Sequence, residues 1–392
     1  MLRKIIILTA ILGLSAGCQS HAQHEKAAKQ RWAKARASIK LTMAEQQYNN
    51  GEYDKALASI YECIGSDPCE PKARLLLGKL MLSQDNLQGA EEQLRLCVQS
   101  DASLDEGWYW LGFALQRQER LKEALQHYNK ALSLAPTRTE YILSAADAEA
   151  AQGNTGKAVE LLGQKMEAMP QNVELKVAAA DLTFRAGRNE EAIELYKKAM
   201  IINSEDDTVA EALGYCYLFS DRHAEAAEIF NRLAERCLDS QKRKLYLEIA
   251  GLSNMKSAQY DRASTCYQKL SKEERKNAEV WVKAGQASLG AGDAKRAIMC
   301  GQKALSLRPD YPDAIAVIGC AQYLQGDYSA AIKSFEKTES DSRHCGFSWL
   351  MRARCYERLG AKEAAEQAYK KGAEISPDSK LVKLLAMEKE ER

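Results

Sequence analysis

Apolar residues recur along this chain with the spacing of paired amphipathic helices. In residues 108–136, WYWLGFALQRQERLKEALQHYNKALSLAP, large apolar side chains fall three or four positions apart, which is typical of one face of an α-helix. Small residues lie among them at Gly112 and Ala124. One isolated helix has no need of small residues at this spacing, whereas two helices can approach closely only where their side chains shrink. The stretch therefore predicts two packed helices.

The same pattern returns every 34 residues. The positions equivalent to Gly112 are also glycine or alanine, at Ala44, Gly78, Ala146, Ala180, Gly214, Gly251, Gly285, Gly319 and Ala353. Twelve residues after each of these sites the chain has alanine, at Ala56, Ala90, Ala124, Ala158, Ala192, Ala226, Ala263, Ala297, Ala331 and Ala365. A three-residue insertion near residues 237–241 interrupts the period once. Self-similarity at a fixed period of this length indicates a repeat array in which each unit packs on its neighbours.

Prolines and glycines mark the ends of the predicted helices. All seven prolines fall at the helix boundaries of this frame, at Pro68, Pro71, Pro136, Pro170, Pro309, Pro312 and Pro377. In six of the ten units a glycine lies between the two predicted helices, at Gly51, Gly153, Gly187, Gly292, Gly326 and Gly360. Each unit is therefore predicted to be a helix, a tight turn, a second helix and a short loop.

This pattern resembles the tetratricopeptide repeat, most clearly where WYWLG in the third unit matches W-x2-L-G. Ten units fit in succession, within residues 37–379, at 37–70, 71–104, 105–138, 139–172, 173–206, 207–240, 244–277, 278–311, 312–345 and 346–379. The match is weaker at Lys165, in a site that is usually small, and at Arg275, which replaces a proline. The resemblance implies an all-α fold, a right-handed superhelical solenoid of about ten helix-turn-helix units. Residues 380–392 are expected to form a C-terminal capping helix.

The first 36 residues precede the repeats. A positively charged start is followed by ten apolar residues, 5–14, a length that suits a signal sequence better than a membrane-spanning helix. The next residues, SAGC, resemble the lipobox of bacterial lipoproteins, although Leu14 lies four rather than three positions before Cys18. The resemblance implies that residues 1–17 are a lipoprotein signal peptide and that Cys18 is acylated after cleavage. An ordinary secretory signal is the alternative.

Residues 18–36 are predicted to be a lipid-anchored tether and N-terminal helix. They carry Lys26, Lys29, Arg31, Lys34 and Arg36 against one acidic residue, Glu25. This basic segment either contacts anionic headgroups or is a solvated spacer. Gln19 rather than aspartate after the cysteine resembles a sorting signal for the outer membrane. The predicted location is the cell envelope, at the periplasmic face of the outer membrane.

The resemblance also implies a concave face that is lined by the first helix of each unit. The residues that map to it are Leu75, Lys79, Tyr109, Phe113, Arg117, Leu143, Asp147, Val177, Asp181, Phe184, Arg185, Tyr215, Leu218, Phe219, Glu248, Leu252, Met255, Tyr323, Arg354 and Arg358. The middle of this face is apolar and aromatic, which suits an extended or helical peptide of a protein partner. Some of these side chains alternatively pack against neighbouring repeats. The residues that clamp chaperone C-terminal carboxylates in some family members are absent, so that class of ligand is not expected.

Three functions are compatible with these observations. The leading hypothesis is a membrane-anchored scaffold that helps to assemble a cell-envelope complex by binding a protein partner in the concave groove. The alternative is a structural spacer without a dedicated peptide ligand. An enzyme is disfavoured, because the five histidines are scattered and no metal-site spacing, catalytic triad or phosphate loop occurs. No cofactor, metal or small-molecule substrate is predicted, and a net charge of +1 argues against a nucleic-acid partner.

Cysteine is unusually frequent, with eleven in the chain and no CxxC pair. Cys63 and Cys97 occupy a position that is alanine in other units, which predicts small buried residues. Cys266 and Cys300 share one position in adjacent units, where a separation of roughly 8–10 Å between helices makes a disulfide strained. Most thiols are expected to be reduced, and the sequence leaves open one or two bridges. His127 is expected to be solvated, on the exposed side of a second helix.

Overall fold

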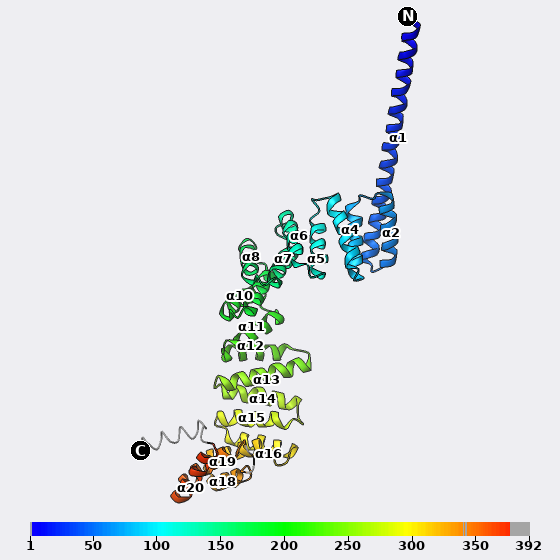
Figure 1. The fold of residues 1–392 in the computed structure, drawn as a ribbon. Helices are drawn as coiled ribbons and strands as arrows, with labels where there is room; N and C mark the ends of the chain where they lie inside the picture. Colours follow the sequence, from blue (N-terminus) through cyan, green and yellow to red (C-terminus); the bar gives the residue numbers. More distant parts are fainter. Residues whose placement is uncertain (1, 340, 342, 377–392) are drawn as a thin grey trace. The chain divides into compact units, whose positions relative to one another are not determined.

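The computed structural model describes the backbone of residues 2–339, 341 and 343–376, and the side chains of these residues from His24 onward. Twenty helices and no strand occur in this part of the chain, so the predicted all-α solenoid class is confirmed (Figure 1). The helices form two compact units, Met1–Gly187 and Arg188–Arg392, here called unit 1 and unit 2. The boundary falls inside the fifth predicted repeat, between its two helices.

Unit 1 contains the first nine helices. Their bounds are α1 Leu2–Asn49, α2 Tyr53–Ser66, α3 Pro71–Ser83, α4 Leu87–Ser100, α5 Asp105–Arg117, α6 Leu121–Leu134, α7 Thr139–Ala151, α8 Thr155–Ala168 and α9 Val173–Arg185. From α3 onward each odd-numbered helix begins 34 residues after the previous one. The predicted tether and the first helix of the first repeat are one continuous helix, α1.

Unit 2 contains the remaining helices. Their bounds are α10 Asn189–Ile202, α11 Asp207–Phe219, α12 His223–Arg236, α13 Ser240–Lys256, α14 Tyr260–Glu273, α15 Ala278–Gly290, α16 Ala294–Leu307, α17 Pro312–Leu324, α18 Tyr328–Glu336, α19 Cys345–Arg358 and α20 Lys362–Ile375. The three-residue insertion lengthens α13, which has 17 residues where most first helices have 13. The second helix of the ninth repeat, α18, is short, with nine residues instead of 14.

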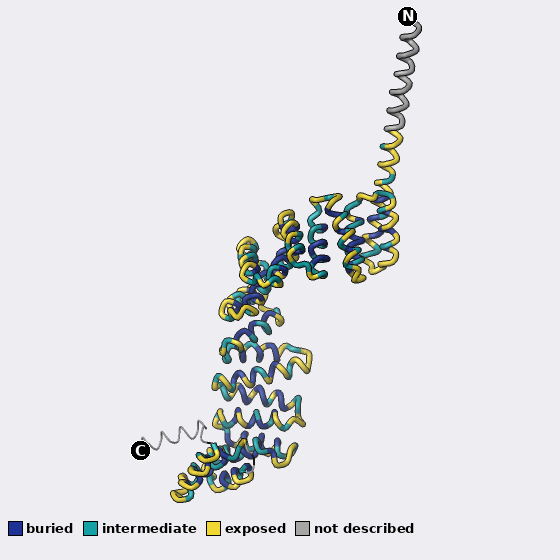
Figure 2. Tube along the Cα trace, viewed as in Figure 1, coloured by how far each residue is buried: buried dark blue, intermediate teal, exposed yellow. Residues whose placement is uncertain are grey.

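Small residues allow the two helices of each pair to pack closely. A Cβ atom placed on Gly112 would lie 2.8 Å from the ring of Tyr128 and 3.1 Å from the carbonyl oxygen of Ala124, closer than real Cβ atoms come to such atoms. In unit 2, a Cβ on Gly251 would lie 2.8 Å from the ring of Tyr267. Each glycine therefore leaves room for an aromatic ring from the second helix, and Figure 2 shows the resulting buried residues running through the helix pairs.

The turn within each pair requires one residue in the left-handed conformation. Ten residues with positive φ occupy this position, namely Gly51, Asp85, Glu119, Gly153, Gly187, Asp221, Ala258, Gly292, Gly326 and Gly360. Glycine adopts such a φ without strain, and six of the ten are glycine. Ala258, with φ of 58°, and Glu119, with φ of 63°, hold a conformation that is unfavourable for residues with a Cβ atom. The turn geometry is therefore retained even where the sequence signal for it is missing.

Candidate partner-binding faces

The first helices of unit 1 enclose a hollow of about 410 Å³. It is lined by Glu45, Tyr48, Asn49, Lys72, Leu75, Leu76, Lys79, Leu104, Asp105 and Glu106, from α1, α3 and the start of α5. Leu75, which the sequence places on the concave face, is buried in its wall beside the half-buried Lys79. Part of the predicted face in unit 1 therefore has the shape of a cleft, and its lining combines charged side chains with Leu75, Leu76 and Leu104.

Three of the charged residues around this hollow, Lys79, Asp105 and Glu106, form ion pairs. Lys79 Nζ lies 3.2 Å from Glu106 Oε2 and 5.1 Å from the centroid of the Trp110 ring. Glu106 Oε1 also lies 3.5 Å from Arg138 Nη2, at the end of the same repeat. The hydroxyl of Tyr141 donates to Asp105 Oδ2 at 2.9 Å. A chain of interactions thus links three successive repeats along this face.

Several aromatic residues predicted to line the face of unit 1 are engaged in packing. The ring of Tyr109 stacks on Tyr141, with centroids 4.7 Å apart, and Phe113 meets Trp110 edge to face at 5.5 Å. Both Tyr109 and Phe113 are half-buried. Arg117 is exposed and pairs with Asp85 of the preceding turn at 2.9 Å. Tyr109 and Arg117 therefore join neighbouring repeats, whereas Phe113 packs within its own helix.

The remaining predicted residues of unit 1 lie further along α7 and α9. Leu143 and Phe184 are half-buried, whereas Asp181 and Arg185 are exposed. None of these four residues lines the hollow, because its walls come from α1, α3 and α5.

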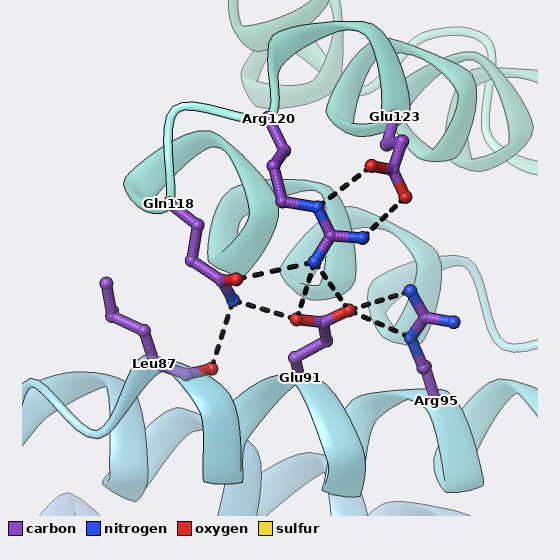
Figure 3. A network of polar contacts seen from close by, with 6 residues as sticks. All are labelled: Leu87, Glu91, Arg95, Gln118, Arg120 and Glu123. Atoms are coloured by element: carbon purple, nitrogen blue, oxygen red, sulfur yellow. Dashed lines mark hydrogen bonds and ion pairs between the residues drawn. The ribbon is translucent and has the colours of Figure 1, made fainter.

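A second polar network joins repeats two and three through their second helices (Figure 3). The carboxylate of Glu91 accepts hydrogen bonds from Arg120 at 2.9 Å, from Arg95 at 2.7 Å and from Gln118 at 3.0 Å. Arg120 also donates to Glu123 at 2.6 Å. Burial alone would raise the pKa of Glu91, but the donors from Gln118, Arg120 and Arg95 outweigh it and lower this pKa. The network is therefore a structural link between repeats in which Glu91 stays ionised.

In unit 2, large apolar side chains of two first helices are left exposed. The Phe219 side chain at the end of α11 is 70% exposed, and Leu252 of α13 is 52% exposed. Leu245, seven residues before Leu252 and therefore on the same helix face, is also exposed. We call Phe219, Leu245 and Leu252 the apolar patch. The sequence mapping missed Leu245, although its spacing from Leu252 was a usable signal.

Ion pairs tie together the helices that carry the apolar patch. Glu248 lies between the two leucines on α13, and its carboxylate pairs with Lys283 of α15 at 2.8 Å. Glu211 of α11 lies 4.0 Å from Lys242 of α13. Burial disfavours a charged Lys283, but Glu248 and Glu279 more than offset this and raise its pKa. Tyr215, Leu218 and Met255, also predicted for this face, are half-buried beside the patch.

The other predicted residues of unit 2 lie near its last repeats. Tyr323 packs against Tyr328, with ring centroids 5.5 Å apart. The guanidinium of Arg358 donates a hydrogen bond to the Tyr323 hydroxyl, and this bond raises the pKa of Arg358. Arg354 is half-buried and Arg358 is exposed. These residues therefore form a separate polar and aromatic cluster on α17 to α19.

The described residues contain no cluster of three or more side chains that could hold a metal ion. All ten cysteines from Cys63 onward are free thiols, and Cys63 and Cys97 are buried, as their repeat position predicts. The expectation for His127 was wrong. Its ring is half-buried and stacks on Trp108 with centroids 5.5 Å apart, and burial lowers its pKa.

Two terminal predictions lie outside the described side chains. These are the acylation of Cys18 and the capping helix at residues 380–392. In the part of the chain that the structure describes, no helix combines the length and apolar character needed to cross a bilayer.

Family models described as tetratricopeptide repeat match five stretches of the chain, at residues 105–138, 143–207, 183–241, 250–312 and 317–380. Together these stretches span about two thirds of the sequence. No curated protein matches the sequence significantly.

Solved structures with a similar fold include *Pseudomonas aeruginosa* PilF, at 15% identity, with 55% of this chain and 97% of that chain covered and a TM-score of 0.45. PilW, a type IV pilus biogenesis factor, is 22% identical over 54% of this chain and 98% of its own, with a TM-score of 0.47. A tetratricopeptide repeat protein from Parabacteroides merdae is 19% identical over 64% of this chain and 98% of its own, with a TM-score of 0.41. Likenesses this distant carry no functional argument. The helix pairs and the matching family models lead to one conclusion: the chain belongs to the tetratricopeptide-repeat family.

Proposed function

We propose that this protein is a membrane-anchored scaffold of the cell envelope that binds a peptide or helix of a protein partner on the first-helix face of unit 2. The tetratricopeptide-repeat fold is typical of protein-interaction scaffolds, and its members are generally not enzymes. The observation that carries the proposal is the apolar patch. Phe219 and Leu252 expose large apolar side chains on adjacent first helices, and burial of such side chains in a complex is favourable.

The paired charges on the face of unit 1 support the choice of unit 2. A ligand that used Lys79 or Glu106 would have to replace an ion pair that already exists, with little net gain. A ligand that covered Phe219 and Leu252 would remove apolar surface from water and would not have to displace a charged group. The ion pairs at Glu248 and Glu211 would then form the polar rim of the contact.

The test is a crosslinked pull-down from envelopes, with the bound proteins quantified by mass spectrometry. It compares the wild type with Phe219→Ser/Leu252→Ser and with a matched control, Ile201→Ser/Met299→Ser, which alters exposed apolar residues on the second helices α10 and α16. We expect a partner that is depleted roughly tenfold or more in the patch variant alone. Identical partner lists for all three proteins would favour the alternative, a structural spacer.

The anchor is proposed to be acylated Cys18, at the periplasmic face of the outer membrane. Two acyl chains hold a protein stably, whereas one alone gives marginal binding. Cys18→Ser is therefore expected to appear in the soluble fraction after the membranes are washed with salt. A protein that remains in salt-washed membranes despite the substitution would contradict the lipoprotein assignment.

A further inference from the structure

The helix α1 has an apolar face that nothing in the described structure covers. Trp32 is 66% exposed, Ile39 61% and Met43 42%. With Ala28 and Ala35, also exposed, they recur every three or four residues and so lie along one side of the helix. We call these five residues the α1 stripe. It extends over about 22 Å of helix.

The buried residues of α1 lie on the other side. Ala37, Leu41 and Ala44 are buried, in cores that also contain residues of α2 and α3. At 100° per residue they are placed roughly opposite Ile39 and Met43. The α1 stripe therefore points away from the repeats, and Figure 2 shows this part of α1 exposed before it reaches α2.

Basic residues accompany the stripe. Residues 24–36 contain five lysines and arginines and one acidic residue, Glu25, which pairs with Lys29 at 2.7 Å. Lys26, Arg31 and Lys34 are exposed and have no ion-pair partner among the described side chains. At 100° per residue Arg31 and Arg36 lie about 60–80° from the middle of the stripe, whereas Lys26 and Lys34 lie about 140° from it and add only to the overall positive charge. An apolar stripe on a helix with a basic excess is the composition of a helix that lies in a membrane interface.

We infer that residues 24–43 of α1 lie flat on an anionic lipid surface, with the α1 stripe in the headgroup boundary and the flanking Arg31 and Arg36 at the lipid phosphates. Tryptophan favours this depth of a bilayer. A second copy of the chain is a poorer occupant, since two strongly basic segments would repel each other. Because the stripe points away from α2, the repeats can stay on the aqueous side. The contact is independent of the partner-binding face and of acylation.

The test uses the full chain with Cys18→Ser, so that no acyl chain contributes. Tryptophan emission is measured with vesicles of phosphatidylcholine and phosphatidylglycerol whose acyl chains are brominated and quench nearby indoles. We expect quenching that is largely lost in Trp32→Phe and retained in Trp281→Phe. Apolar residues 5–14 are identical in all these proteins, so any binding they add does not alter the comparison.

A second arm tests the charges by vesicle flotation. Lys26→Gln/Arg31→Gln/Lys34→Gln is expected to weaken binding to the anionic vesicles by roughly tenfold or more. The control, Lys122→Gln/Lys130→Gln/Lys198→Gln, removes the same charge from exposed sites on second helices and is expected to bind as the parent does. Any of three results would overturn the inference. The quenching could be equal in Trp32→Phe and the parent, the two triple variants could weaken binding equally, or the parent could bind pure phosphatidylcholine vesicles as well as the anionic vesicles. Sedimentation showing that Trp32→Ser/Ile39→Ser/Met43→Ser dissociates a dimer, without any lipid binding by the parent, would assign the stripe to a second copy instead.

Discussion

The first-helix faces of unit 1 and unit 2 differ in the interactions that their side chains make and in how much apolar surface they expose. In unit 1, Lys79 of the second repeat pairs with Glu106 of the third beside the hollow, and Glu106 also pairs with Arg138. In unit 2, the ion pairs lie beside exposed Phe219 and Leu252. Charges that are already paired stabilise the solenoid but offer a ligand little net energy, whereas exposed apolar side chains gain on burial. Two regions with the same repeat therefore present different surfaces, and this difference is the basis for proposing unit 2 as the binding region.

The cores of the two units, in contrast, have the same requirement, a small residue where the two helices of a pair touch. Substitution of this residue by a larger one tests the requirement. Ala124 in unit 1 and Ala263 in unit 2 are fully buried at the same repeat position. Ala124→Leu and Ala263→Leu are each expected to lower the free energy of unfolding by about 1–3 kcal/mol. Urea unfolding followed by circular dichroism measures both. A large loss in one variant and none in the other would show that the two units do not share one packing frame.

The repeat pattern predicted the helices well because it is set by contacts within each pair. A small residue at Gly112 and an alanine twelve positions later are needed wherever two helices touch, so their spacing marks both helices. The extra turn of α13 and the short α18 were less predictable. The insertion near residues 237–241 could equally have lengthened a loop, and nothing in the period indicates that α18 ends at Glu336.

The faces were harder to predict than the pairs. The position of Tyr109 in its repeat places it on the concave side, but Tyr141 of the following repeat covers its ring. Phe219 is also placed on this side, at the end of its first helix, and is left exposed. Whether such a residue is available depends on the neighbouring repeat's side chains, which a pattern within one repeat does not contain. His127 was misjudged for a related reason, because Trp108 covers it.

The links between second helices also differ between the units, and carboxylate substitutions sharpen this difference. The Glu91 side chain is only 14% exposed and accepts from three residues, whereas the exposed Glu190 in unit 2 pairs with Arg222 alone at 3.1 Å. Glu91→Gln is expected to lower the free energy of unfolding by about 1–2 kcal/mol, and Glu190→Gln by less than about 0.5 kcal/mol. Equal effects in urea unfolding would contradict this ranking.

The same carboxylate gives a pH dependence with a definite sign. Since the pKa of Glu91 is lower in the folded protein, its contribution to stability is fully present above its unfolded pKa of about 4.3. That contribution is lost as the pH falls below this value and through the folded pKa. The difference in stability between wild type and Glu91→Gln should therefore narrow below about pH 4. A difference that stays constant from pH 7 to pH 3 would exclude ionised Glu91 as its source.

A further small effect is expected at two strained turns, Glu119 in unit 1 and Ala258 in unit 2. Glu119→Gly in unit 1 and Ala258→Gly in unit 2 place glycine at a positive φ that six of the other eight turns assign to glycine. Removal of the strain is partly offset by the greater flexibility of glycine in the unfolded chain. Each variant is expected to gain about 0.5–1 kcal/mol in free energy of unfolding. A loss of stability in either variant would show that its turn is not strained.

The central claim is that unit 2, through its apolar patch, contacts a protein partner and that the paired face of unit 1 does not. Photo-crosslinking in living cells tests it most directly, with benzoylphenylalanine placed singly at Leu252, at Lys79 or at Met299 on the outer surface of α16. We predict one discrete crosslinked product from position 252 and none from positions 79 and 299. A product from position 79 or 299, with none from position 252, would contradict the claim.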